Sequence, residues 1–90
     1  MIKILDFWAD WCYPCKIMDP VLEEVEKELK DQVVIEKINV DQNPAKATEF
    51  GVMSIPTYIV TKDDKEVDRL IGATSKENFS NFIKKHVPQE

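Results

Sequence analysis

The feature that most constrains this chain is a close pair of cysteines, Cys12 and Cys15, in the stretch D-W-C-Y-P-C-K at residues 10–16. They are the only two cysteines among the 90 residues. A chain this short buries one hydrophobic core, so we expect a single domain over residues 1–90. Two cysteines cannot form the disulfide framework of a small secreted protein, and a close pair in a cytosolic chain is usually redox-active or metal-binding. The surrounding elements help to choose between these two kinds of site.

An apolar segment precedes the pair and an amphipathic segment follows it. Residues 2–7 contain an apolar run of strand length that only Asp6 interrupts, as expected of a strand covered on both faces. After the cysteines, apolar residues recur at helical spacing and acidic residues take the other side. The apolar positions are Met18, Val21, Leu22, Val25 and Leu29. This spacing predicts an amphipathic helix, so the cysteines lie where a strand passes into a helix.

The middle of the chain completes a β-α-β unit and adds a short helix. Residues 33–40 are rich in β-branched side chains and predict a second strand, parallel to the first with a right-handed crossover. Asn43 and Pro44 suit the start of a short helix over residues 45–50, and Gly51 suits its end.

The last third of the chain predicts a hairpin and a closing helix. Residues 57–61 and 66–71 read as strands joined by a short polar turn. Thr74 and Glu77 form a capping box ahead of a helix whose apolar residues run from Phe79 to Val87. The predicted fold class is α/β, with a central four-stranded mixed sheet flanked by helices and the element order β-α-β-α-β-β-α.

The position of the cysteines at a helix start favours redox chemistry. Unpaired backbone N–H groups and the helix dipole stabilise a thiolate there, and a spacing of three residues brings both sulfurs to one face. Pro14 is tolerated in a first helical turn and stiffens it. A closed zinc site needs four ligands, whereas the sequence offers this pair and a single histidine, His86. We therefore predict a redox pair and no metal site.

Asp6 is the second unusual residue, because a carboxylate in a buried strand is costly unless it is paired. Burial should raise its pKa, and such a base could accept the proton of Cys15; the alternative is a structural aspartate satisfied by backbone or water. Lys37 has the strand parity that points it inward beside the first strand. It is either the partner of Asp6 or a lysine that extends to solvent from an edge strand.

Charge and hydropathy exclude two classes of partner. The net charge of −5 opposes sequence-independent binding of nucleic acid, which needs a basic surface. No apolar run approaches the length of a membrane helix, and the first residues lack the features of a signal peptide. We expect a cytoplasmic protein that does not associate with membranes.

Five segments together closely resemble the thioredoxin family, over essentially all 90 residues. They are residues 6–16 (D-F-W-A-D-W-C-Y-P-C-K), Pro20, residues 39–44 (N-V-D-Q-N-P), residues 51–57 (G-V-M-S-I-P-T) and Gly72-Ala73. A C-x-x-C pair alone is a moderate signal. The combination of W-C-x-P-C-K with I-P-T about 40 residues later, in the same order of strands and helices, is very specific.

The resemblance implies a dithiol-disulfide oxidoreductase of the thioredoxin fold that reduces protein disulfides. Cys12 would be the nucleophile and Cys15 the resolving thiol, with Asp6 as the buried acid and Lys37 beside it. Pro56 matches the family's cis-proline, although from sequence alone a trans bond after Ile55 is the default. The expected substrate-binding residues are Trp11, Tyr13, Pro14, Ile55, Pro56, Gly72 and Ala73, with an extended substrate chain pairing beside Ile55. Trp8 is expected in the core.

The resemblance also implies what the protein works with. Its partners would be disulfide-containing proteins and an electron donor of the thioredoxin reductase type, and no cofactor is expected beyond the Cys12–Cys15 disulfide. We expect a monomer.

Three departures from the family pattern bear on this interpretation. Tyr13 stands where thioredoxins usually have glycine, which bears on reduction potential and choice of partner. Asp19, one helical turn after Cys15, adds a negative charge that would oppose thiolate formation if it lies close, and is otherwise a solvated helix residue. The chain also lacks the strand and helix that most thioredoxins place first, which would leave residues 33–40 as a sheet edge, blunted by Glu36 and Lys37.

Three other functions compete with a protein-disulfide reductase. A glutaredoxin-like enzyme would use glutathione, but Ile55 replaces the threonine or valine common there, and Gly72-Ala73 replaces Gly-Gly. A disulfide donor would need a destabilised disulfide and usually an exported chain. A binding module would use the surface around Trp11 and Pro56 without redox turnover, and would keep its function without the cysteines.

Overall fold

The computed structural model describes residues 1–87, and the last three residues of the expected domain, 88–90, lie outside the described part. The predicted element order is confirmed. The elements are β1 (Ile2–Trp8), α1 (Tyr13–Glu28), β2 (Val33–Asn39), α2 (Pro44–Glu49), β3 (Thr57–Lys62), β4 (Lys65–Ile71) and α3 (Lys76–Lys84).

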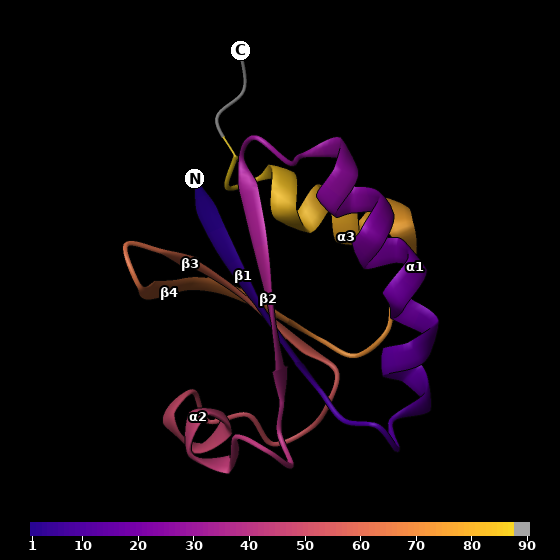
Figure 1. The fold of residues 1–90 in the computed structure, drawn as a ribbon. Coiled ribbons are helices and arrows are strands. Elements are labelled where there is room, and N and C mark those ends of the chain that lie inside the picture. The colour runs from indigo at the N-terminus through magenta and orange to yellow at the C-terminus, as the bar shows by residue number, and fades with distance from the viewer. Residues whose placement is uncertain (88–90) are drawn as a thin grey trace.

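The four strands form one mixed sheet in the order β2-β1-β3-β4, as predicted (Figure 1). β1 pairs in parallel with β2 and antiparallel with β3, and β3 pairs antiparallel with β4. In this register Asp6 lies between Lys37 of β2 and Tyr58 of β3. Within the described residues β2 is an edge strand, as expected for residues 33–40.

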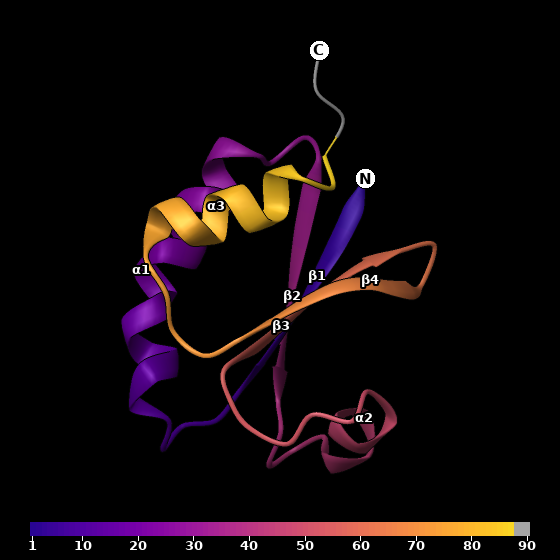
Figure 2. The ribbon, with the colours of Figure 1, turned by 180° about the vertical axis from the view of Figure 1, so that it is seen from behind.

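Helices cover both faces of the sheet. α1 and α3 lie together on one face, while α2 lies apart from them across the sheet (Figures 1 and 2). The face under α1 and α3 carries the larger core, in which Ile4 packs with Met18, Tyr58 and Phe79. The other face packs Leu5 and Phe7 with groups from α2 and the segment after it. Since side chains alternate along β1, Asp6 points to the same face as Ile4, toward α1.

Local sequence explains most element ends, and one prediction needs a correction. Asp63 and Asp64 form the two-residue turn of the β3–β4 hairpin with positive φ values of 52° and 65°, which aspartate tolerates better than most residues. The N-cap of α3 is Ser75, whose Oγ accepts the N–H of Asn78 at 3.1 Å, and not the predicted Thr74. Both residues can cap a helix, so the sequence pattern alone could not separate them.

Candidate active site

Cys12 and Cys15 form a disulfide at the N-terminus of α1, with their Cα atoms 5.3 Å apart. Cys12 is the N-cap residue, in extended backbone conformation, and Cys15 lies in the first helical turn. Both residues are buried against Ala9 and are flanked by Trp8 and Ile55. The predicted pair is therefore positioned by the junction of β1 and α1, with both sulfurs at one helix start.

The helix start directs a hydrogen-bond donor at the first sulfur. The backbone N–H of Cys15 donates to Sγ of Cys12 at 3.2 Å. Pro14 lies in the same turn, where its missing backbone N–H costs the helix no hydrogen bond. In the dithiol form the same N–H and the helix dipole favour negative charge on the Cys12 sulfur. This arrangement supports Cys12 as the attacking thiolate.

Asp6 lies in the middle of β1 and is 2 % exposed. Burial raises the pKa of its carboxyl from 3.8 to about 6, with Lys37 lowering the pKa and Asp19 raising it further. The direction matches the sequence prediction, and its cause is desolvation of the charged form. At neutral pH the carboxyl is largely ionised, yet it is a stronger base than an ordinary aspartate.

Lys37 faces the α1 side of the sheet, as its parity predicts, but its amine is bonded to Asp19. Nζ of Lys37 lies 3.2 Å from Oδ1 of Asp19, and also lies 6.0 Å from the centre of the Trp8 ring. The ammonium therefore acts on Asp6 only through space, as one of the causes that lower its pKa. Lys37 shows one feature of each alternative given by the sequence. It lies beside Asp6 in register, and its side chain extends to the surface from an edge strand.

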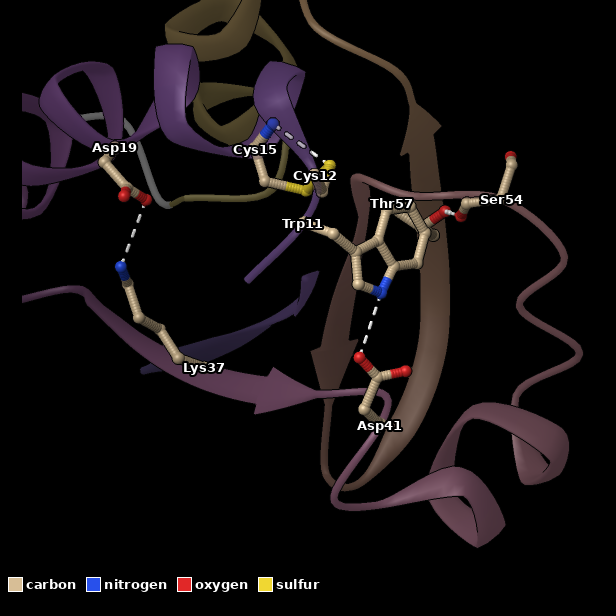
Figure 3. Close-up of a disulfide and its surroundings, with 8 residues drawn as sticks. All are labelled: Trp11, Cys12, Cys15, Asp19, Lys37, Asp41, Ser54 and Thr57. Atoms are coloured by element: carbon tan, nitrogen blue, oxygen red, sulfur yellow. Dashed lines mark hydrogen bonds and ion pairs between the residues drawn. A yellow bond between two sulfur atoms is a disulfide. The ribbon is translucent and has the colours of Figure 1, made fainter. Parts of the chain in front are cut away.

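Trp11 is 69 % exposed and is held in place by a hydrogen bond. Trp8 was expected in the core but is only half-buried, because it ends β1 and packs against Ala9 and the cysteines rather than inside the main core. Nε1 of Trp11 donates to Oδ2 of Asp41 at 2.9 Å (Figure 3). Oδ1 of Asn39 in turn accepts the backbone N–H of Asp41 at 2.9 Å, which orders the turn after β2. An exposed indole fixed at its polar end presents its apolar ring to solvent beside the disulfide.

The Ile55–Pro56 peptide bond is cis, as the resemblance implies and contrary to the trans default. Pro56 is buried and its carbonyl accepts the N–H of Gly72 at 2.8 Å. Gly72 has a φ of +94°, a conformation that a side chain would strain. The hydrogen bond from Gly72 to Pro56 holds the end of β4, and with it the exposed Ala73, against the start of β3. Pro56, Gly72 and Ala73 are thus brought to one end of the sheet.

An apolar groove of about 200 Å³ runs beside the disulfide. Its lining residues come from four segments of the chain: Trp11, Val40, Ala47, Val52, Met53, Ser54 and Ile55. Val40 and Ile55 also pack against the two cysteines, so the groove and the disulfide share a wall. Two apolar side chains of this region are strongly exposed, Met53 of the groove at 97 % and Tyr13, between the cysteines in sequence, at 72 %. Such exposure is expected of a surface that contacts a partner.

Ile55 packs against the two cysteines and Trp11 lines the groove with it, while Pro56 and Gly72 are bonded to each other and Asp6 and Lys37 are neighbours in the β1–β2 register. The structure adds two residues that the sequence prediction missed. Asp41 fixes Trp11, and Met53 lines the groove. Both lie inside the segments on which the family resemblance rests, residues 39–44 and 51–57, so the signal was present in the sequence. The sequence did not show the hydrogen bond between Asp41 and Trp11 or the position of Met53 in the groove.

Among residues 1–87, no three histidine, cysteine, aspartate or glutamate side chains converge in a way that could hold a metal ion. Within the same residues, no helix has the length and apolarity needed to cross a membrane.

Comparisons with known proteins agree with the site geometry. The family model "Thioredoxin" matches residues 1–85. The thioredoxin of Staphylococcus haemolyticus is 48 % identical over 86 residues, covering 96 % of this chain and 83 % of the relative. Thioredoxin 1 of Synechococcus elongatus is 42 % identical over 84 residues, covering 93 % and 78 %. A solved mutant thioredoxin from Halobacterium salinarum superposes with a TM-score of 0.90 at 29 % identity, covering 99 % of this chain and 77 % of that one.

Proposed function

This chain belongs to the thioredoxin family of protein-disulfide oxidoreductases, and we propose that it works in the reducing direction, through a dithiol-disulfide cycle of Cys12 and Cys15. The observation that carries the proposal is the Cys15 N–H directed at Sγ of Cys12, 3.2 Å away at a helix N-terminus. This donor favours the Cys12 thiolate, which is the form that attacks a disulfide. The single domain over residues 1–90 supplies the whole site.

In the first step the Cys12 thiolate attacks one sulfur of a substrate disulfide. A bond forms between Cys12 and that sulfur, and the substrate disulfide breaks. The other substrate sulfur leaves as a thiolate and takes a proton from solvent. The product is a mixed disulfide between Cys12 and the substrate.

In the second step Cys15 releases the substrate. Asp6 accepts the proton of the Cys15 thiol, since it is a buried base with a pKa of about 6 on the face toward α1. The Cys15 thiolate attacks Sγ of Cys12, forms the intramolecular disulfide, and expels the second substrate sulfur, which is then protonated. Two electrons pass from the cysteine pair to the substrate, and Lys37 tunes the base from the surface.

Substrate binding is proposed for the surface around the groove. An extended chain would pair its backbone beside Ile55, while its side chains contact the apolar groove, because main-chain pairing gives affinity with little demand on sequence. The proposed contact residues are Trp11, Tyr13, Pro14, Ile55, Pro56, Gly72 and Ala73. The exposed rings of Trp11 and Tyr13, and the packing of Ile55 against the two cysteines, support this role.

The cycle needs an external electron donor and no cofactor beyond the disulfide. We propose a thioredoxin reductase-type donor, which would pass two electrons to the oxidised pair and so make the protein an electron carrier. We also propose a cytoplasmic location, since a reducing compartment keeps such a pair in its dithiol form. The protein would act as a monomer, because the charged side chains of the edge strand β2, Lys37 and the Glu36 that pairs with Lys3 of β1, oppose edge pairing.

The test is reduction of a disulfide-containing protein by the wild type and by single cysteine variants, with dithiothreitol as the electron source. Cys15→Ser should accumulate a mixed disulfide at Cys12, visible by mass spectrometry, while Cys12→Ser should form none. Each variant is the matched control of the other, because both lose one sulfur from the same helix start.

Two results would overturn the proposal. A Cys12→Ser/Cys15→Ser protein that keeps its function would be a binding module that uses the Trp11 and Pro56 surface. Turnover of glutathione-mixed disulfides supported by glutathione, with no reduction of protein disulfides, would indicate a glutaredoxin-like enzyme.

A further inference from the structure

The contacts of Lys37 do not follow from its place in the sheet. Lys37 lies directly opposite Asp6 in the β1–β2 register, and both side chains point to the α1 side. A lysine in this place is positioned to pair with the buried carboxyl. Instead its Nζ lies 3.2 Å from Oδ1 of Asp19. The amine of Lys37 thus bonds to a carboxylate on α1, above the sheet.

Asp19 occupies a defined place relative to the active site. It lies on α1 four residues, or about one helical turn, after Cys15. Its side chain is 47 % exposed and that of Lys37 is 49 % exposed, so the ion pair lies at the surface (Figure 3). The Nζ atom of Lys37 also lies 6.0 Å from the centre of the Trp8 ring. The pair therefore bridges α1 and β2 on the side of the disulfide away from Asp41.

Two charged side chains act on the Asp6 carboxyl, and a third ionisable group, Tyr58, lies beside it. Lys37 of β2 and Asp19 of α1 have opposite effects on its pKa, the first lowering it and the second raising it. Tyr58 of β3 lies opposite Asp6 in register and is fully buried. The pKa of the Tyr58 phenol is raised by burial first and then by the charges of Asp6 and Asp19, so the phenol stays neutral. Asp19 and Lys37 are thus the two charges that decide how readily Asp6 ionises.

We propose that Asp19 is a positioning residue for the active site: by holding the Lys37 ammonium at the surface, it keeps that charge off Asp6 and preserves Asp6 as a base strong enough to take the Cys15 proton. Without Asp19, the Lys37 amine can swing toward Asp6, its neighbour in the β1–β2 register, and stabilise the Asp6 carboxylate. Asp6 would then ionise at lower pH and become a weaker proton acceptor. Only the link to the Cys15 proton rests on the proposed function, whereas the coupling among the three side chains does not.

The test measures the protonation of Asp6 itself, in the oxidised protein and without substrate. The ¹³C resonance of the Asp6 carboxyl, assigned by its loss in Asp6→Asn, is titrated by NMR. Asp19→Asn should lower the midpoint of the titration by about one pH unit, because the lysine can then approach. Lys37→Met should raise the midpoint. In Lys37→Met the further change Asp19→Asn should have a much smaller effect, since there is no ammonium left to position.

The matched control is Glu26→Gln, which removes a carboxylate from an exposed position of the same helix. If Asp19→Asn moves the midpoint no more than this control, the inference is wrong. It is also wrong if Asp19→Asn has its full effect in the Lys37→Met background, because Asp19 would then act by direct repulsion. Asp19, Lys37 and Glu26 are exposed or half-exposed, so their variants should fold as the wild type does.

The result is independent of whether the protein reduces disulfides. A protein without reductase activity but with the coupled titration would refute the proposed function and leave the role of Asp19 intact. Its catalytic consequence is read separately, from the pH profile of mixed-disulfide resolution. That profile should move to lower pH in Asp19→Asn by as much as the Asp6 titration does.

Discussion

Asp6 and Asp68 lie on two strands of one sheet, but their surroundings shift the pKa values of the two carboxyl groups in opposite directions. Asp6 of β1 is 2 % exposed, and burial raises its pKa to about 6. Asp68 of β4 is half-buried and lies 2.8 Å from Nε2 of His86 at the end of α3, with Lys85 at 3.7 Å. The hydrogen bond with His86 is the main cause that holds the pKa of Asp68 below its usual range.

The difference separates a carboxylate that stabilises the fold from one that costs stability. Asp68 fastens the C-terminal helix to the sheet through a paired charge. Asp6 lies in the core, while the ammonium of Lys37 pairs with Asp19 and not with Asp6. A buried charge that the fold does not pair directly is a feature of sites whose chemistry needs it. In the proposed cycle that chemistry is the transfer of the Cys15 proton to Asp6.

The largest effect is expected from Asp6→Asn. The folded protein binds the Asp6 proton more tightly than the unfolded chain does, so wild-type stability falls as the pH rises from about 4 to about 6 and stays lower above. Asparagine does not titrate. A pKa raised from 3.8 to about 6 corresponds to about 3 kcal/mol, so the stability of Asp6→Asn relative to wild type should grow by roughly that amount between pH 3 and pH 8.

Urea unfolding of the oxidised proteins at both pH values measures this difference. The same variant should release substrate more slowly, by on the order of a hundredfold, near the lower end of what a positioned base supplies. A stability difference that does not change with pH would mean that Asp6 is not the buried, perturbed group described above.

Asp68→Ala should have the opposite sign and a smaller size. Its carboxylate is stabilised in the folded state, so the contribution is present at neutral pH and is lost as the pH falls through the lowered pKa. At pH 7 the variant should lose roughly 0.5 to 1 kcal/mol, as partly exposed hydrogen-bonded pairs usually do. Urea unfolding at pH 7 and pH 3 measures the loss, and Glu77→Gln on α3 is the control. Stabilisation at pH 7 would erase the contrast with Asp6.

Trp11→Phe tests the substrate surface without touching either carboxylate. The ring is 69 % exposed, so folding stability should change by less than about 0.5 kcal/mol. The phenyl ring cannot donate to Asp41, so the side chain loses its fixed orientation. We expect KM for a protein disulfide to rise about fivefold, equivalent to about 1 kcal/mol of binding, with kcat little changed. Steady-state kinetics decide the matter, and an unchanged KM would remove Trp11 from the contact surface.

The smallest effect is expected from Met53→Ser at the rim of the groove. Met53 is 97 % exposed, so only a substrate can bury it, and we expect KM to rise about twofold. Val67→Ser is the matched control, since Val67 is an exposed apolar residue of β4 that does not line the groove. Equal kinetics for the two variants would mean that substrate does not reach Met53.

The sequence predicted the elements well because their patterns are local. The apolar run around Asp6, the helical spacing after Cys15 and the polar turn of the hairpin each depend on neighbours within a few residues. The pair Cys12 and Cys15 was placed at a helix start by the same reasoning. Ser75, one residue from the predicted cap, shows how little local pattern distinguishes adjacent hydroxyl residues.

Side-chain partners distant in sequence could not be predicted in this way. Lys37 reaches Asp19 across 18 positions and Trp11 reaches Asp41 across 30. Parity placed Lys37 on the correct face, but the choice between Asp6 and Asp19 depends on how α1 packs over the sheet. Local rules do not contain that packing, and it determines the charge environment of the site.

The most direct test of the whole account is the equilibrium reduction potential of the Cys12–Cys15 pair in a glutathione redox buffer. A protein-disulfide reductase requires a potential at or below the cytosolic glutathione poise of roughly −220 to −260 mV, and this is the result we predict. A potential of roughly −180 to −120 mV would contradict the account, because the pair would then donate disulfides more readily than it reduces them.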